Sequence, residues 1–338
     1  MNGKLRGDLP YHITAALTAA VWGTTFISSK LLLDEGLSPA AIMTLRFALA
    51  YVCMLPFLRG RIFADNWRDE LQMALLGITG GSLYFLLENT ALLYTQASNV
   101  AIIIAATPLL TTLAVHRIVR QESAGRRLYI CSLISLAGVA LVVFNGQFLL
   151  KLNPRGDLLT FGAAITWVIY SILVLRLEKR YPPTMITRKI FFYGVVTLAP
   201  YFLFRPEHLT LEILMRPTVI GNILYLGIAA SLICYWTWNM VIRRLGAIRA
   251  TNYLYLNPIV AMITAHIVLG ERITPLALAG TALIIFGVSV AQRHAAANTT
   301  KGPADKNNCP TRDNISHKRL SLSRLNHLFT IRNLPEHE

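Results

Sequence analysis

Ten long apolar segments, separated by short charged stretches, constrain this chain more than any other feature of its sequence. A helix needs about 20 predominantly apolar residues to cross the hydrocarbon core of a bilayer. Backbone groups in lipid must find their hydrogen-bond partners within the helix. Only 14% of the 338 residues are charged, against about 25% in soluble domains. The sequence therefore predicts an all-α integral membrane protein with ten transmembrane helices, over residues 11–33, 38–58, 69–93, 98–116, 127–144, 156–177, 188–204, 217–240, 247–269 and 274–291.

The distribution of basic residues between these segments predicts the orientation of the chain. With the N-terminal residues 1–10 in the cytoplasm, the inside segments before the C-terminal tail hold 17 Lys and Arg, and the outside loops hold six. Cytoplasmic loops carry the excess of basic residues in membrane proteins. We therefore expect a multi-pass protein of the cell membrane with both termini in the cytoplasm.

The last segment, 292–338, is polar and holds eight of the 32 Lys and Arg. We predict a disordered, basic cytoplasmic tail, because the segment has too few apolar residues to build a core. The alternative is a short helix at an anionic lipid surface, built on Leu320, Leu322, Leu325, Leu328 and Phe329. Membrane lipids are thus an expected partner and nucleic acid is not.

The two halves of the chain resemble each other at an offset of 150 residues. Recurring residues include Leu76-Gly77-Ile78 as Leu226-Gly227-Ile228, Asn89 as Asn239, Pro108 as Pro258 and His116 as His266. A half with five helices, an odd number, places the next half in the opposite orientation. We therefore predict two inverted five-helix repeats, 11–144 and 156–291, an arrangement typical of alternating-access carriers. A duplication kept for packing alone is the alternative.

Several of these motifs resemble a known family. They are Trp22-Gly23, Arg46, the stretch Ala91-Leu92-Leu93-Tyr94-Thr95, Ala101, Pro108 and the closing Leu269-Gly270-Glu271-Arg272-Ile273-Thr274. Together they resemble the drug/metabolite transporter superfamily, EamA type, across residues 11–291. The resemblance implies ten helices, cytoplasmic termini and transport of small organic solutes. The first repeat departs from the family pattern, with Arg120-Gln121-Glu122 where Gly-Glu-Arg is usual.

Two ionisable residues lie inside predicted helices, where a charge is costly. An Arg at the centre of a span costs about 2.5–3.5 kcal/mol on insertion scales, so its side chain must face protein or water. We interpret Arg46 as a contact for an acidic group of the substrate; snorkelling or pairing with Glu88 is the alternative. Glu88 is the candidate for proton coupling, and a water-exposed carboxylate near the membrane surface is its alternative.

Aromatic and polar residues at comparable levels of several helices predict a mostly apolar pocket with a few polar groups. The candidate substrate-binding residues are Trp22, Thr25, Arg46, Tyr84, Trp167, Tyr170, Trp238 and Asn252. Pro108 and Pro258 lie inside the fourth and ninth predicted helices and are candidate hinges, with a purely shape-forming kink as the alternative.

These observations predict a secondary active transporter that exports a small organic metabolite, such as an amino acid, a related metabolite or a drug, by alternating access. We expect no cofactor, no metal site and no enzymatic activity, because no nucleotide-binding loop or cluster of metal-ligating residues is present in the sequence. An intramembrane enzyme, or a scaffold or receptor that acts through the basic tail, is the alternative.

Overall fold

The computed structural model describes residues 2–57, 62–95, 100, 103–119, 126–144, 153–204, 210–269 and 273–300. Its contacts divide the chain into two units, Met1–Ala296 and Ala297–Glu338, and the fold described here is that of the first. Every regular element in the described ranges is a helix. The prediction of an all-α fold is confirmed. The predicted tail, 292–338, is described only as far as residue 300, and these first residues belong to a helix that begins at Pro275 rather than to a disordered segment. Residues 301–338 lie outside the described residues.

Helices of the first repeat occupy the first five predicted segments. The first two are α1 (Asn2–Asp34) and α2 (Pro39–Met54), the latter followed by η1 (Leu55–Phe57). The third is one continuous helix made of α3 (Trp67–Gly77), η2 (Ile78–Ser82) and α4 (Leu83–Tyr94), here called the third rod of the repeat. The last two are α6 (Thr107–Ala114), followed by η3 (Val115–Val119), and α7 (Arg126–Phe144). Ser38 caps α2 by accepting a hydrogen bond from the amide of Ala41, and Asn66 caps α3 in the same way.

Helices of the second repeat follow the same order. They are α8 (Pro154–Leu177), α9 (Pro183–Phe204), the short α10 (Leu211–Leu214), the rod of α11 (Pro217–Leu224), η4 (Tyr225–Ile233) and α12 (Cys234–Leu245), then α13 (Ala247–Thr251), η5 (Asn252–Leu256) and α14 (Asn257–Leu269), and α15 (Pro275–Thr300).

Five helical segments of the described chain are long and apolar enough to cross a membrane: Asp8–Asp34, Pro39–Phe57, Trp67–Tyr94, Pro154–Leu177 and Pro217–Leu245. Shorter apolar helices run over Leu128–Val142 and Pro275–Ala291. Many large apolar side chains on these helices are exposed, such as Leu17, Val52 and Phe286. An exposed apolar surface on long helices fits a lipid environment, and the integral membrane fold is confirmed.

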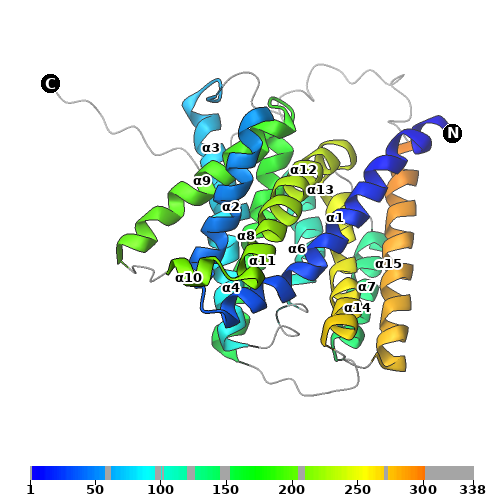
Figure 1. Cartoon of the computed structure of the whole chain (residues 1–338). Helices are drawn as coiled ribbons and strands as arrows, with labels where there is room; N and C mark the ends of the chain where they lie inside the picture. The colour runs from blue at the N-terminus through cyan, green and yellow to red at the C-terminus, as the bar shows by residue number, and fades with distance from the viewer. Residues whose placement is uncertain are drawn as a thin grey trace. The chain divides into compact units, whose positions relative to one another are not determined.

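The two repeats are inverted and exchange equivalent contacts. The third rod of each repeat packs against the first helix of the other, α4 on α8 and α12 on α1 (Figure 1). Along α4 and α8 the chains run in opposite directions, because Thr95 lies against Gly156 and Tyr84 against Trp167. Since α4 has the same direction as α1 in an up-down-up repeat, α8 opposes α1.

A π-helical segment interrupts the third rod of both repeats. It covers Ile78–Ser82 in the first and Tyr225–Ile233 in the second, so the two segments overlap at the 150-residue offset. Neither interruption is predicted by the sequence pattern. A π-helical turn inserts extra residues into the helix and leaves some backbone carbonyls without their usual partner.

Two details of the predicted helices are wrong. The seventh helix was expected to begin at residue 188, but α9 begins at Pro183. Arg188 and Lys189 therefore lie within it and are buried. Pro108 and Pro258 are not in helix interiors: they are the second residues of α6 and α14. At the start of a helix a proline has no backbone hydrogen bond to break.

Candidate functional site

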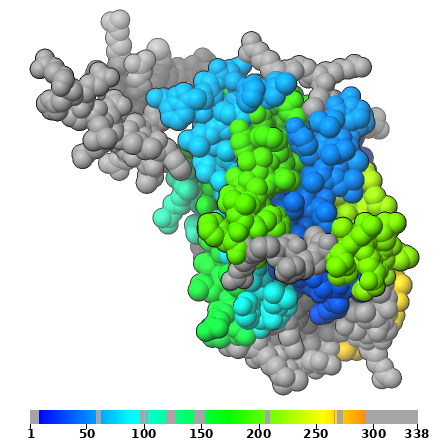
Figure 2. All heavy atoms as spheres, turned by 60° about the vertical axis from the view of Figure 1, so that its left-hand side comes forward, coloured from blue at the N-terminus to red at the C-terminus, as the bar shows by residue number. Residues whose placement is uncertain are grey.

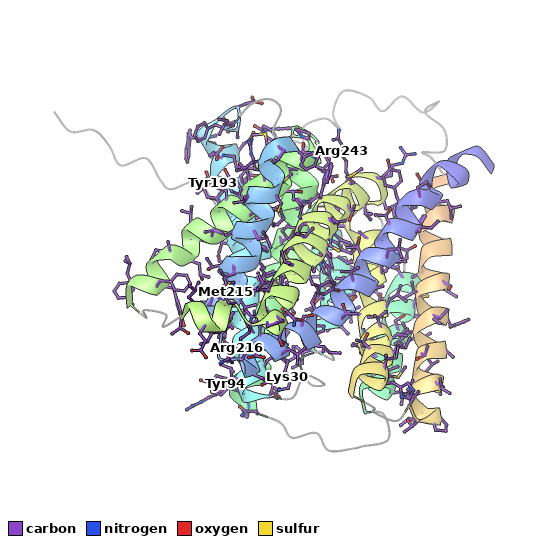
Figure 3. The ribbon with its side chains drawn as sticks, viewed as in Figure 1. Lys30, Tyr94, Tyr193, Met215, Arg216 and Arg243 are labelled. Atoms are coloured by element: carbon purple, nitrogen blue, oxygen red, sulfur yellow. The ribbon has the colours of Figure 1, made fainter. Side chains whose placement is uncertain are left out.

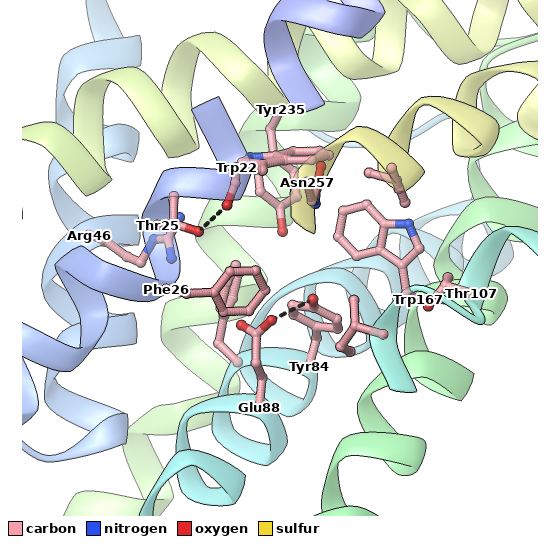
Figure 4. A pocket seen from close by; sticks show the side chains of 13 residues that line it. Trp22, Thr25, Phe26, Arg46, Tyr84, Glu88, Thr107, Trp167, Tyr235 and Asn257 are labelled. Carbon is pink, nitrogen blue, oxygen red and sulfur yellow. Dashed lines mark hydrogen bonds between the residues drawn. The ribbon is translucent and has the colours of Figure 1, made fainter. Parts of the chain in front are cut away.

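A pocket lies between the two repeats in the interior of the helical bundle (Figure 4). It holds about 470 Å³ of space that no atom fills, including the space at its mouth. Its lining residues are Trp22, Thr25, Phe26, Arg46, Tyr84, Phe85, Glu88, Ile104, Thr107, Trp167, Tyr235, Leu254 and Asn257. The first, second and third helices of the first repeat contribute most of the polar groups.

Aromatic rings form the wall of this pocket. Trp22 is at the centre, with its ring centroid 5.3 Å from that of Trp167 and 5.6 Å from that of Tyr235. Tyr84 packs on Trp167 at 5.2 Å. These rings come from both repeats, since Trp22 and Tyr84 belong to the first and Trp167 and Tyr235 to the second. Large rings that contact one another in this way form a rigid apolar surface.

The π-helical segments hold two of these aromatic side chains in place. The Nε1–H of Trp22 donates to the backbone oxygen of Ala230 at 2.9 Å, and the hydroxyl of Tyr235 donates to the backbone oxygen of Gly80. Gly80 and Ala230 are equivalent positions of the two repeats. In each repeat a backbone oxygen of the π-helical segment thus accepts a hydrogen bond from an aromatic residue of the pocket, and this links the backbone irregularity to the shape of the site.

Arg46 enters the pocket from α2 and is 1% exposed. Its Nε donates to the hydroxyl of Ser231 at 2.9 Å, and its guanidinium carbon lies 4.3 Å from the ring centre of Phe85. The terminal Nη2 is buried and has no hydrogen-bond partner among the described residues. Arg46 therefore neither snorkels to the membrane surface nor forms an ion pair with Glu88, and it retains a free donor beside the pocket.

Glu88 enters from α4, on another side of the pocket (Figure 4), and is 7% exposed. Its Oε1 accepts a hydrogen bond from the hydroxyl of Tyr84 at 2.8 Å. The alternative of a water-exposed carboxylate near the membrane surface is wrong, because the four-residue spacing from Tyr84 directs both side chains into the same interior space.

Two further lining residues stand where a helix begins. Thr107 is the first residue of α6, and Asn257 is the first residue of α14; the pair is equivalent by the 150-residue offset. A turn at residues 105–106 precedes α6, and a 3-10 segment precedes α14. The signal in the sequence was the proline that follows each residue, because proline is favoured in the first positions of a helix.

The candidate substrate-binding residues divide into two groups. Trp22, Thr25, Arg46, Tyr84 and Trp167 line the pocket together with Glu88. Tyr170, Trp238 and Asn252 are buried but lie outside its lining. The pocket also contains residues that were not among the candidates: Phe26, Phe85, Ile104, Thr107, Tyr235, Leu254 and Asn257.

Trp238 and Tyr170 lie outside the lining and pack against the back of its aromatic wall. Trp238 packs on Trp22 with ring centroids 5.0 Å apart, and Tyr170 packs on Trp167 at 4.9 Å. The hydroxyl of Tyr170 donates to Asn239 at 2.7 Å. Pro108 and Pro258 are each one residue beyond a lining residue.

A second polar cluster joins the repeats away from the pocket. On one face of the unit α9 packs beside α3 and α2 (Figure 2). Lys189 and Tyr193 of α9 both donate to Glu70 of α3. Figure 3 shows Tyr193 toward one end of the helices, and Lys30 and Arg216 toward the other.

Asp69, next to Glu70 in α3, holds the turn between α8 and α9. Arg180 pairs with it at 3.1 Å, and the hydroxyl of Tyr181 donates to it at 2.8 Å. Burial raises the pKa of the Tyr181 hydroxyl, so this group remains a proton donor. The cluster thus ties α3 of the first repeat to the start of the second repeat's second helix.

An inverted-repeat bundle of membrane-spanning helices, with charged and aromatic side chains from both halves around an interior pocket, is the architecture of a membrane transporter. The sequence profile of the EamA-like transporter family matches residues 9–144 and again 154–292. The chain belongs to the EamA-like transporter family.

Relatives with assigned names agree with this membership. An uncharacterized transporter of Archaeoglobus fulgidus is 27% identical over 289 residues, covering 84% of this chain and 98% of the relative. A probable amino-acid metabolite efflux pump of Salmonella typhimurium is 24% identical, covering 82% and 92%. A probable terminal-alkyne amino-acid exporter of Streptantibioticus cattleyicolor is 28% identical, covering 82% and 91%. One crystal structure matches with a TM-score of 0.68 at 18% identity, covering 84% of this chain and 97% of that one, and it supports the fold alone.

Proposed function

We propose that this transporter is a secondary active exporter that moves a small organic metabolite by alternating access. The observation that carries the proposal is the convergence of Arg46, Glu88 and six aromatic rings from both repeats on one interior pocket. Two inverted bundles that exchange conformations can open such a pocket to either side of a membrane in turn. The names of the two amino-acid exporters above support export of an amino acid or a related metabolite.

The proposed orientation places both termini in the cytoplasm of a cell membrane, because 17 Lys and Arg lie in the inside segments and six in the outside loops. The driving force is a gradient of protons or solute. Glu88 is the proposed proton carrier, since a buried carboxylate with one hydrogen-bond partner can exchange a proton as the pocket opens to water. Pro108 and Pro258, each the second residue of its helix, are the proposed hinges.

Reconstitution of the purified chain in liposomes tests this function. Amino acids and related metabolites are first screened for the ability to raise its melting temperature, since a ligand that binds the folded form stabilises it. Ligands that bind are then loaded as radiolabelled solutes, and their movement is measured with and without a pH gradient, in the absence of ATP. The proposal expects gradient-driven transport by the natural chain, and Glu88→Gln to lose the response to pH. Full pH-driven transport by Glu88→Gln would remove Glu88 from coupling.

Removal of the tail separates transport from a scaffolding role. A chain that ends at residue 296 keeps the whole of the first unit, Met1–Ala296. We expect it to transport at the rate of the full chain. A truncated chain that folds, as judged by its melting temperature, but does not transport would instead make the tail necessary for function.

A further inference from the structure

Two side chains of opposite charge, Arg46 and Glu88, line the pocket without forming an ion pair with each other. Arg46 and Glu88 both contribute to its surface and are 1% and 7% exposed. The ion pairs of the described residues join other partners, and none links Arg46 to Glu88. Burial of a charge in an apolar interior is costly unless an opposite charge or hydrogen bonds compensate it.

The hydrogen bonds around each charge are incomplete. A guanidinium has five N–H donors, yet only a single neutral hydroxyl, that of Ser231, is bonded at Nε, and Nη2 has no partner within the described chain. An ionised carboxylate accepts about four hydrogen bonds, and Glu88 receives one from Tyr84. Three further polar atoms of the lining are also buried without a partner among the described residues: Oγ1 of Thr107, Nε1 of Trp167 and Oδ1 of Asn257.

A solute with a single charge compensates one side of this pocket and leaves the other unchanged. An anion satisfies Arg46 but is repelled by Glu88, and a cation has the opposite effect. A zwitterion presents a carboxylate to the free Nη2 of Arg46 and an ammonium group to Glu88, so that both charges gain a partner on binding. Selectivity then comes from the mismatch with singly charged solutes as well as from the match with the zwitterion.

Resting on the proposed transport function, we propose that the pocket selects zwitterionic solutes, with their carboxylate bound by Arg46 and their ammonium group held between Glu88 and the aromatic wall. The faces of Trp22, Trp167 and Tyr84 favour a cation, and indole rings do so most strongly. The same rings, with Phe26 and Leu254, leave an apolar surface for the rest of the solute. Aliphatic and aromatic amino acids have this chemistry.

Matched triplets of ligands test the inference on the purified full chain in detergent. One triplet is L-phenylalanine, 3-phenylpropanoate and phenethylamine; the second is L-leucine, 4-methylpentanoate and 3-methylbutylamine. Within a triplet the apolar part is alike and only the charged groups differ. We expect at least one amino acid to bind about tenfold or more tightly than both of its singly charged analogues, measured as ligand-dependent melting temperature and by equilibrium binding.

Two neutralising variants assign the charges to their residues. In Arg46→Gln, we expect the amine analogue to bind with an affinity within about twofold of that of the amino acid. In Glu88→Gln, we expect the carboxylate analogue to bind with an affinity within about twofold of that of the amino acid. Thr281→Val is the control outside the pocket, because the Thr281 hydroxyl donates to the backbone oxygen of Ala277 in its own helix and carries no charge. It should leave both ratios unchanged.

The ligand series on the natural chain stands even where a variant fails to fold. Failure of both amino acids to bind about tenfold more tightly than their singly charged analogues overturns the inference, and so does the absence of amino-acid binding in both triplets. The transport function is tested separately in liposomes. Transport of singly charged solutes alone would overturn the zwitterion inference and leave the transporter intact. An amino acid that binds but is never transported would support the zwitterion inference and contradict the transport function.

Discussion

Asn239 is the residue on which three helices of the second repeat depend for their polar contacts. Its side chain is 1% exposed; it accepts a hydrogen bond from Tyr170 of α8 at 2.7 Å and donates one to Thr187 of α9 at 2.8 Å. Tyr170 in turn supports Trp167 in the pocket wall. A single amide therefore connects the packing of α12 with the position of a lining residue.

We expect Asn239→Ala to lower the free energy of unfolding by about 1–3 kcal/mol, because it leaves the Tyr170 and Thr187 hydroxyls buried without their partner. The measurement is the melting temperature in detergent. Asn222→Ala is the control: Asn222 bonds only to the carbonyl of Thr218 in its own helix, at an exposed site. Equal melting temperatures for the two variants would show that the buried bonds contribute nothing.

A contact between Gly138 of α7 and Gly280 of α15 sets the distance between these two helices. A Cβ on Gly138 would lie 2.6 Å from the backbone oxygen of Gly280, and a Cβ on Gly280 would lie 2.6 Å from that of Gly138. Because both obstacles are backbone atoms, no side-chain rotation relieves them. Small residues at helix contacts in membranes allow this close approach of backbones.

Gly138→Ala should therefore destabilise the chain by about 1–3 kcal/mol, since the two helices must separate. Gly221 in α11 has nothing within 4 Å of the corresponding Cβ position. Gly221→Ala is expected to be neutral or to stabilise by up to about 1 kcal/mol, because Ala favours the helix. Unfolding in denaturant or heat would separate the pair, and a loss of stability in Gly221→Ala alone would contradict the expectation.

The ionic cluster of Lys189, Tyr193 and Glu70 connects α9 of the second repeat with α3 of the first. Lys189 has a side chain only 4% exposed, and its partner Glu70 is 20% exposed. We expect Lys189→Met to cost about 2–4 kcal/mol, because Glu70 then lacks its countercharge and keeps Tyr193 and the Ala64 amide as donors. Lys30, whose pair with Asp34 leaves both side chains more than 60% exposed, is the control: Lys30→Met should change the melting temperature little.

Sequence patterns predicted the apolar spans and their inversion, because the bilayer imposes length and composition on every span. They also identified Arg46, Glu88, Trp22 and Trp167, four of the lining residues, since charges inside spans are rare and the two Trp mark equivalent helices. These patterns depend only on which residue types lie within each apolar span, so a single sequence is enough to detect them.

What the sequence did not reveal depends on helix irregularities. A π-helical turn rotates every later residue to a different face, and Tyr235 and Trp238 both follow one. Helical periodicity therefore could not tell that Tyr235 lines the pocket and that Trp238 packs behind it. Likewise, the early start of α9 depends on burial of Lys189 against Glu70, a contact between segments 119 residues apart.

The inverted arrangement has a direct consequence for the molecule as a whole. Asp65 and Met215 are equivalent positions of the two repeats, each just before the third rod, and both side chains are exposed. In parallel repeats they would face the same side of the membrane. Inverted repeats place them on opposite sides, and the proposed orientation, based on the excess of basic residues in the inside segments, predicts that Asp65 faces the cytoplasm.

Single cysteines at these two positions test inversion and orientation together. In a background without Cys53, Cys131, Cys234 and Cys309, a membrane-impermeant maleimide should label Met215→Cys in intact cells. Asp65→Cys should react only after the membrane is permeabilised, and the cysteine-free chain is the control. Labelling of both positions from outside would refute inverted repeats. The reverse pattern, with Asp65→Cys alone labelled in intact cells, would keep the inversion and reverse the proposed orientation of the whole protein in the membrane.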